Sequence, residues 1–244
     1  MVAGFDRYFQ VAPCFRDEDA RADRSPGEFY QLDMEMSFVT QEDVFAVVEK
    51  VLHGIFLEFS TQKVDDIPFR RISYRDAMLM YGCDKPDLRI PIVMKDVGSV
   101  FAGSDFKEFR SVLEDGGSIR AIPVKSIADR SRSFFDRTVE YAQSIGAKGL
   151  AYLVWSGDKV KGPLGKFLTE AQLAQIAQIC EVKDGDVVFF VADTAAETNR
   201  IAGQIRTKLG ADLDIIEKNA FRFCWIVDFP MFEWDNDRNC VGFS

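Results

Sequence analysis

The chain has 244 residues, a formal net charge of −9 and five cysteines, and 47% of its residues are hydrophobic while 28% are charged. This composition is typical of a globular protein that buries a core of its own. No apolar run approaches the roughly 18 residues of a membrane span, and the amino terminus lacks a signal-peptide pattern. The acidic balance disfavours non-specific binding of DNA or RNA. The cysteines are scattered without a C-x-x-C pair, which predicts reduced thiols in a cytoplasmic protein and no zinc site.

An antiparallel hairpin is predicted near the amino terminus. Residues 30–38 alternate strictly, with apolar residues at even positions and polar residues at odd positions, as in a strand with one face in a core. The preceding strand alternates in the same way, so that Arg16 leaves it on the polar side. Residues 17–28 join the two strands. We therefore expect Arg16 to share one open polar face with Gln31, Asp33 and Glu35, with the apolar face buried.

The residue types on this polar face favour a charged ligand. The guanidinium of Arg16 suits a phosphate, because it donates two parallel hydrogen bonds and stays charged. The carboxylate of Asp33 suits an ammonium group.

Two helices are predicted after the hairpin. Thr40, followed by Asp43 three residues later, is typical of a helix start. An apolar stripe at helical spacing then runs over residues 44–59, and we expect this helix to cover the apolar back of the hairpin. Residues 74–81 predict a short helix that ends at Gly82.

From about residue 92 onward the pattern changes to alternating strands and helices, which predicts a separate α/β unit. The predicted strands cover residues 97–101, 118–124, 149–155 and 186–192, and the predicted helices cover residues 131–145, 169–180 and 194–209. Residues 161–167 lack the first glycine and the Ser/Thr of a phosphate-binding loop and predict an ordinary turn. Residues 221–229 predict a strand that returns to the first sheet, and residues 232–239 predict a hairpin turn.

Several segments carry a resemblance to a known family. Residues 14–19 (CFRDED) and 28–38 (EFYQLDMEMSF) resemble motif 2 of the class II aminoacyl-tRNA synthetases, and in detail that of the bacterial aspartyl-tRNA synthetases. Four further segments resemble the same enzymes in the same order: residues 4–10 (GFDRYFQ), 21–24 (RADR), 81–89 (YGCDKPDLR) and 228–233 (DFPMFE). The resemblance covers essentially the whole chain.

This resemblance implies an α+β fold, in which part of a class II antiparallel sheet is flanked by helices and carries an inserted α/β domain of the GAD type. It places the motif 2 part of the catalytic domain at residues 1–91, the insert at residues 92–220 and a return strand of the catalytic domain at residues 221–244. The chain would then be an internal piece of a longer enzyme and inactive alone. The parent would be a cytoplasmic homodimer that binds neither membrane nor DNA.

The implied activity is that of an aspartate–tRNA ligase. The parent would use ATP, with Mg²⁺ held mostly through phosphate oxygens, to convert L-aspartate to aspartyl-adenylate, and would transfer it to tRNA(Asp). Whether tRNA(Asn) is charged as well is left open. As the catalytic residue, Arg16 would hold the α-phosphate of ATP and the carboxylate of the activated amino acid. Gln31 would contact the adenylate, and Asp33 would receive the α-ammonium of aspartate.

The remaining roles implied by the resemblance concern ATP and tRNA. Phe29 would stack on adenine, while Asp17 and Glu18 would line the ATP site and the approach of the tRNA end. The other implied contacts lie in the loop: Ser25 to ATP, and Arg21 and Arg24 to the tRNA acceptor end. The family commonly has glutamine where Ser25 stands, and Gly27 is an addition.

Two other functions remain open. A class II relative could keep this site but make another product, such as an amide, although the insert argues against it. Alternatively, the chain could be a non-catalytic module whose insert binds tRNA or a protein partner.

Overall fold

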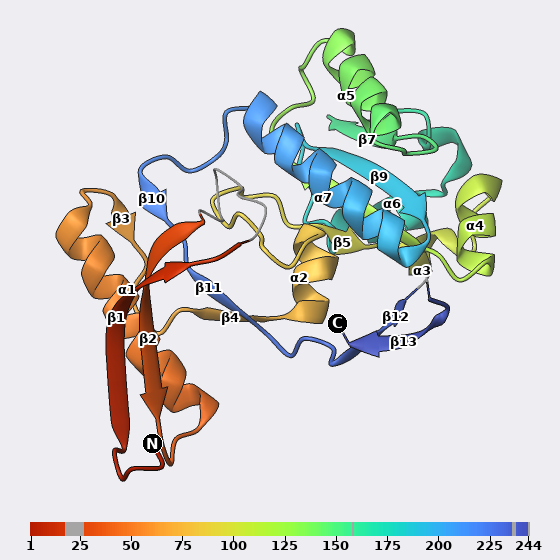
Figure 1. The fold of residues 1–244 in the computed structure, drawn as a ribbon. Coiled ribbons are helices and arrows are strands. Elements are labelled where there is room, and N and C mark those ends of the chain that lie inside the picture. The colour runs from red at the N-terminus through yellow and green to blue at the C-terminus, as the bar shows by residue number, and fades with distance from the viewer. Residues whose placement is uncertain (18–26, 158, 236–237, 244) are drawn as a thin grey trace. The chain divides into compact units, whose positions relative to one another are not determined.

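A computed structural model of the protein describes residues 1–17, 27–157, 159–235 and 238–243 (Figure 1). These residues form two compact units, unit 1 (Met1–Pro68) and unit 2 (Phe69–Ser244). In the described ranges, none of the helices is both long enough and apolar enough to cross a membrane. The mixture of antiparallel strands and helices agrees with the predicted α+β class. The domain boundaries at residues 91 and 220 stay predictions.

Unit 1 is built on the predicted hairpin. Its elements are β1 (Arg7–Phe15), β2 (Glu28–Met36), α1 (Gln41–Phe59) and β3 (Lys63–Val64). β1 and β2 pair antiparallel, with Gln10 opposite Asp33 and Cys14 opposite Phe29. The predicted start of α1 is confirmed, because the Thr40 backbone N–H donates to Asp43 Oδ2 at 2.8 Å.

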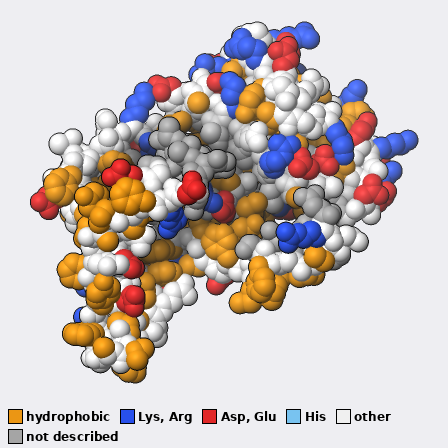
Figure 2. All heavy atoms as spheres, in the orientation of Figure 1, with side chains coloured by type: hydrophobic (Ala, Val, Ile, Leu, Met, Phe, Trp, Pro, Cys, Tyr) orange, Lys and Arg blue, Asp and Glu red, His pale blue; other side chains and the backbone are white. Residues whose placement is uncertain are grey.

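The apolar face of the hairpin differs from the prediction. Phe9, Val11, Phe15 and Tyr30 are between 63% and 75% exposed, so the expectation that this face lies in a core is wrong for the described structure. Figure 2 shows hydrophobic side chains gathered over the hairpin and α1. A two-stranded sheet and one helix present more apolar surface than they can cover for each other.

Helix α1 covers the hairpin only in part. Val47 and Val51 of α1 line a cavity of about 710 Å³ together with residues of both strands. The strands contribute four apolar side chains to this cavity: Phe9, Leu32, Met34 and Met36. The helix lies on the predicted side of the hairpin, but it does not close a packed core there.

Unit 2 contains the remaining elements. Its strands are β4 (Arg70–Ser73), β5 (Lys95–Asp96), β6 (Ser118–Val124), β7 (Ala151–Ser156), β8 (Lys159–Lys161), β9 (Val187–Asp193), β10 (Ala220–Phe221), β11 (Cys224–Val227), β12 (Phe232–Asp235) and β13 (Cys240–Phe243). Its helices are α2 (Tyr74–Tyr81), α3 (Gly98–Phe101), α4 (Lys107–Glu114), α5 (Arg132–Ser144), the 3₁₀ helix η1 (Gly165–Phe167), α6 (Glu170–Ile179) and α7 (Ala195–Asp212).

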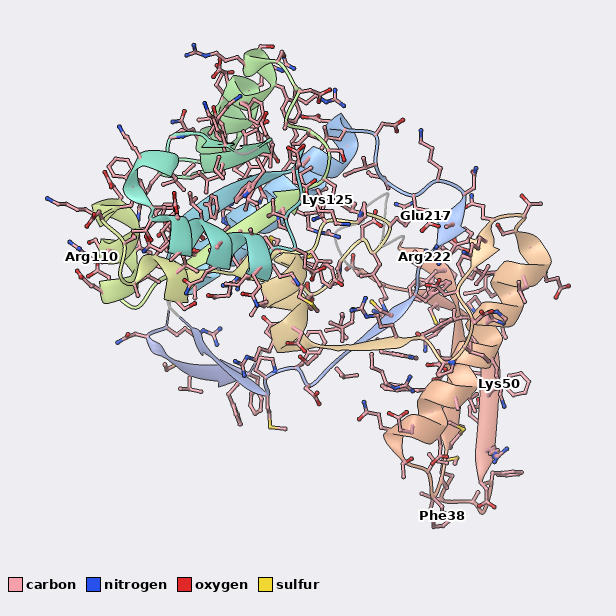
Figure 3. All side chains as sticks on the ribbon, turned by 180° about the vertical axis from the view of Figure 1, so that it is seen from behind. Phe38, Lys50, Arg110, Lys125, Glu217 and Arg222 are labelled. Atoms are coloured by element: carbon pink, nitrogen blue, oxygen red, sulfur yellow. The ribbon has the colours of Figure 1, made fainter. Side chains whose placement is uncertain are left out.

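A five-stranded sheet in the order β5-β6-β9-β7-β8 forms the centre of unit 2, and all of its strand pairs are antiparallel. Side chains of α5 and α7 pack on one face, and those of α3, α4 and α6 pack on the other. Accordingly, α7 lies in front of the sheet in Figure 1 and α6 lies in front of it in Figure 3. The sheet is therefore covered on both sides.

The sequence of strand β9 is apolar without alternation because both faces of the strand are buried. Val187, Phe189 and Val191 point into the core on the α5 and α7 side, whereas Val188 and Phe190 point into the core on the other side. All five side chains are at most 2% exposed. A strand that is buried on both faces has a continuous apolar sequence.

The predicted strand at residues 97–101 is wrong. This segment forms the short helix α3, and the strand β5 precedes it. Val97, Val100 and Phe101 are all buried on the same side of the sheet, which corresponds to the i, i+3, i+4 spacing of a helix. The side chain of Asp96 accepts a hydrogen bond from the Gly98 N–H at 2.9 Å and helps to start the turn.

The segment after α7 returns to the start of unit 2. Strand β11 pairs parallel with β4, with Cys224 opposite Arg70 and Val227 opposite Ser73. The predicted strand at residues 221–229 is present only in part, because β10 ends at Phe221 and β11 begins at Cys224. Strands β12 and β13 pair antiparallel and extend into the segment predicted as a turn.

Helices α2 and α7 approach closely at two glycines. Gly82 ends α2 as predicted, with φ of 76°. A Cβ atom on Gly82 would lie 2.3 Å from the Asn199 carbonyl oxygen, and one on Gly203 would lie 2.9 Å from the Tyr81 carbonyl oxygen. Both glycines are therefore required by the close contact, and Gly82 is also required by its left-handed backbone conformation.

A buried carboxylate stabilises the start of β9. Asp186 Oδ1 accepts from the Ser126 N–H at 2.9 Å, and Asp186 Oδ2 accepts from the Lys183 N–H at 2.8 Å and from Lys125 Nζ at 3.1 Å (Lys125 is labelled in Figure 3). Burial acts to raise the pKa of Asp186, but these hydrogen bonds outweigh it and hold the pKa below its usual value.

We expect Asp186 to make unit 2 sensitive to acid. Its folded-state pKa lies below the unfolded value of about 3.9, so its stabilising contribution is complete above that value and is lost as the pH falls through the folded pKa. Asp186→Asn should cost about 2 kcal/mol at neutral pH, because an amide then faces a backbone N–H. The substitution should also make the stability of unit 2 less dependent on acidic pH. Hydrogen exchange of the β9 amides, corrected for intrinsic rates, measures both effects.

The matched control is Asp212→Asn. Asp212 is a partly exposed residue that pairs with Lys208, and its substitution should change stability by at most about 0.5 kcal/mol. Equal losses for the two variants would contradict the role assigned to Asp186.

Candidate functional site

The candidate site lies on the polar face of the hairpin in unit 1. The register places Phe29 opposite Cys14, Gln31 opposite Ala12, and Asp33 opposite Gln10. Directly opposed residues of antiparallel strands point to the same face. The structure therefore brings Gln31 and Asp33 together on one face, as the alternation predicted, and it places Phe29 on the same face.

Arg16 follows β1 on the same face. Its backbone N–H donates to the Gly27 carbonyl at 2.8 Å, which continues the strand pairing by one residue. Its guanidinium carbon lies 5.3 Å from the centroid of the Phe29 ring, within the range of a cation–π contact. The predicted position of Arg16 on the polar side is confirmed, and a cation lies beside an aromatic ring at this end of the site.

Asp33 lies at the other end of the face and belongs to a chain of hydrogen bonds. Gln10 Nε2 donates to Asp33 Oδ2 at 3.3 Å, and the Tyr8 hydroxyl donates to Gln10 Oε1 at 2.8 Å. Asp33 is half-buried, whereas Tyr8 and Gln10 are exposed. The carboxylate is thus held by a neutral donor rather than by a cation.

Small side chains separate the two ends of the face. Ala12 and Cys14 are the β1 residues opposite Gln31 and Phe29. Phe29 and Asp33 are four residues apart, or about 13 Å along a strand. An extended ligand with an aromatic group at one end and an ammonium at the other would fit along this polar face.

Some predicted site residues cannot be placed. Glu18, Arg21, Arg24 and Ser25 lie outside the described residues. Asp17 is the last described residue before that loop and is exposed.

The prediction from sequence assigned no role to Tyr8 and Gln10. The signal was present in the sequence, because both residues fall on the polar side of the same alternation that places Asp33. Only the strand register shows that Gln10 is the residue directly opposite Asp33.

The described residues contain no cluster of three or more His, Cys, Asp or Glu side chains placed to bind a metal ion.

A second cavity, of about 900 Å³, lies in unit 2 between α2 and α7. Two of the basic residues that line it are already paired: Arg200 with Glu197 at 2.6 Å, and Lys208 with Asp212 at 2.5 Å. It contains none of the predicted site residues and is not part of the candidate site.

Comparison with known proteins gives consistent matches. The family described as tRNA synthetases class II (D, K and N) matches residues 1–240. An aspartate–tRNA(Asp/Asn) ligase from Ehrlichia chaffeensis is 54% identical over 244 residues, and the match covers 100% of this chain and 41% of that protein. The protein of the same name from Rickettsia canadensis is 53% identical over 245 residues, with the same two coverages. The chain thus spans about 41% of the length of these relatives.

Among solved structures, a hypothetical protein from Pyrococcus horikoshii OT3 has a TM-score of 0.31 and 22% sequence identity, and the match covers 45% of this chain and 68% of that one. A similarity at this level supports no conclusion about the chain.

Proposed function

The chain belongs to the class II tRNA synthetases of the D, K and N group, and on this basis we propose that it is part of a longer aspartate–tRNA ligase. The relatives that carry that name are 54% and 53% identical to it. The observation that supports the proposal best is the polar face of the hairpin, which presents a guanidinium beside an aromatic ring at one end and a carboxylate at the other.

The proposed reaction joins aspartate to the α-phosphate of ATP. An oxygen of the aspartate α-carboxylate attacks the α-phosphorus and forms an O–P bond, while the bond to the bridging oxygen breaks and its electrons leave with pyrophosphate. Arg16 stabilises the negative charge on the α-phosphate and orients the carboxylate. Because no covalent intermediate with the protein forms, the rate depends on positioning and on this charge stabilisation.

The other residues of the face bind and orient the substrates. Phe29 stacks on adenine, Gln31 contacts the adenylate, and Asp33 receives the α-ammonium of aspartate. When bound, Mg²⁺ neutralises charge on the phosphate oxygens of ATP and takes most of its ligands from them. Asp17 lines the part of the site that binds ATP.

The loop after β1 supplies the remaining contacts in this proposal. Glu18 and Ser25 line the ATP site, whereas Arg21 and Arg24 face the phosphates of the tRNA acceptor end. Local arginines of this kind suit one structured RNA even in an acidic protein. Following the names of the relatives, the acceptors are tRNA(Asp) and also tRNA(Asn).

We further propose that residues 92–220 are an inserted domain of the GAD type and that the full-length enzyme is a cytoplasmic homodimer. The parallel pairing of β11 with β4 supports the insertion, because the chain leaves the neighbourhood of β4 after Ser73 and returns to it at Cys224. The 244 residues alone are expected to have negligible activity, because the chain spans only about 41% of its relatives' length.

The proposal is tested by ATP–pyrophosphate exchange with each of the standard amino acids, using the full-length protein that contains these residues. Exchange that requires aspartate supports the ligase, and charging of tRNA(Asp) and tRNA(Asn) transcripts then defines the acceptors. Exchange with no amino acid would contradict the ligase and would favour a module that binds tRNA or a partner. Exchange by the 244-residue chain at full-length rates would contradict the expected inactivity of the piece.

A further inference from the structure

A line of three polar side chains on the hairpin ends at Asp33. The Tyr8 hydroxyl donates to Gln10 Oε1 at 2.8 Å, and Gln10 Nε2 donates to Asp33 Oδ2 at 3.3 Å. Tyr8 and Gln10 are two residues apart in β1 and therefore point to the same face. Gln10 lies directly opposite Asp33 in the register, so the contact is built into the strand pairing.

The chemistry of these groups fixes the direction of every hydrogen bond. An ionised carboxylate only accepts, so Gln10 must present its NH₂ group to Asp33. The two ends of a glutamine amide have nearly the same shape, and a reversed amide would set an oxygen against the carboxylate. The Asp33 carboxylate therefore selects the amide orientation, and the Tyr8 hydroxyl, which donates to Oε1, holds the Gln10 side chain in this position.

The geometry also leaves part of the carboxylate available. Gln10 engages Oδ2, and among the described residues no hydrogen bond to Oδ1 is found. A carboxylate oxygen that is oriented but unshared suits a cationic ligand, because the side chain no longer has to be ordered when the ligand binds.

We propose that Gln10 is a positioning residue for substrate binding, that it orients the Asp33 carboxylate toward the α-ammonium of aspartate, and that Tyr8 acts through Gln10 by fixing its amide. This inference rests on the proposed function, in which Asp33 is the ammonium-binding group. Neither Tyr8 nor Gln10 touches the reacting phosphorus in this assignment. Their effect is therefore on aspartate binding and not on the chemical step.

Gln10→Met tests the role of the amide in the full-length enzyme, because methionine keeps the length of the side chain and removes the donor. In ATP–pyrophosphate exchange, the KM for aspartate should rise about tenfold, the scale of one lost hydrogen bond to a charged group. The KM for ATP and kcat should stay within about twofold of the unsubstituted enzyme, as expected when only binding of one substrate is weakened.

Tyr8→Phe should raise the KM for aspartate by about threefold, because Gln10 then loses the hydrogen bond that holds its amide beside Asp33. The double variant should be no worse than Gln10→Met alone, since Tyr8 acts only through Gln10. Tyr30→Phe is the matched control, because it removes the same hydroxyl from the opposite face of the hairpin. It should leave all three constants unchanged.

Three outcomes would overturn the inference. An unchanged KM for aspartate in Gln10→Met would show that Asp33 needs no such support. Equal rises in the KM for aspartate and for ATP, with a lower melting temperature, would show that the three side chains only stabilise the hairpin. Additive effects in the double variant would remove the link through Gln10. Failure of the proposed function can be distinguished from failure of this inference alone, because the unsubstituted enzyme would then show no aspartate-dependent exchange. In that case the inference would be wrong as well.

Discussion

Aspartate-dependent ATP–pyrophosphate exchange is expected to fall by about 10²–10³-fold when Arg16 is replaced by alanine in the full-length enzyme, the scale of losing one preorganised charge stabiliser. Arg16 stands at the end of β1, held by backbone pairing to Gly27 and by contact with the Phe29 ring. Because negative charge on the α-phosphate is greatest in the transition state, kcat should fall more than the KM values rise.

Two further variants sharpen this prediction. Arg16→Lys keeps the charge but loses the two parallel donors, and its exchange rate should lie between those of the unsubstituted enzyme and Arg16→Ala. Arg7→Ala is the matched control, because Arg7 lies on the other face of the same hairpin, opposite Met36. An Arg16→Ala enzyme within about threefold of the unsubstituted rate would be far below the loss expected for a catalytic group and would remove Arg16 from the mechanism.

The second large effect is expected at a buried arginine of α7. Arg206 is 1% exposed. Its Nε donates to the Ile92 carbonyl at 2.7 Å, and one terminal nitrogen donates to the carbonyls of Asp87 and Ile90, each at 2.9 Å. Its guanidinium carbon also lies 4.9 Å from the centroid of the Tyr81 ring. Burial lowers the pKa of Arg206, yet an arginine stays charged in proteins.

Arg206→Leu should therefore lower the free energy of unfolding of unit 2 by about 3–5 kcal/mol. The variant leaves two buried carbonyl groups and one part-buried carbonyl group without their donor, and each unsatisfied buried group costs about 1–3 kcal/mol before relaxation. Loss of this size is a large part of the 5–15 kcal/mol that is typical of a whole domain. Urea unfolding combined with hydrogen exchange at residues 87–94 would measure both the size and the place of the loss.

Arg132→Leu is the control for Arg206→Leu. The Arg132 side chain is 93% exposed and makes a 3.7 Å ion pair with Asp136. The same substitution there should change stability by at most about 0.5 kcal/mol. Similar losses for both variants would show that Arg206 does not hold the segment from Asp87 to Ile92.

The hairpin site could be predicted from sequence because it depends on local periodicity. A period of two decides which side chains share a face, and two antiparallel strands then bring Arg16, Phe29, Gln31 and Asp33 together. The hydrogen bond from Gln10 to Asp33 could not be predicted, because it depends on the exact register, and alternation alone allows any shift by two residues.

Other features depended on long-range packing. Residues 97–101 have a short apolar run that fits a strand or a helix, and contact with the core on one side of the sheet selects the helix α3. The order of strands and helices did not reveal that β9 lies between β6 and β7 in an antiparallel sheet. The exposure of the apolar face of the hairpin could not be predicted either. Alternation shows that one face is apolar, but it does not show which part of the protein covers that face.

A crystal structure of the full-length enzyme with a non-hydrolysable analogue of aspartyl-adenylate tests the central claim most directly. The account predicts that the analogue lies along the polar face of the hairpin, with its phosphate mimic hydrogen-bonded to Arg16, its adenine on Phe29 and its α-ammonium at Asp33. An analogue bound away from this face, or bound there with the ammonium remote from Asp33, would contradict the account.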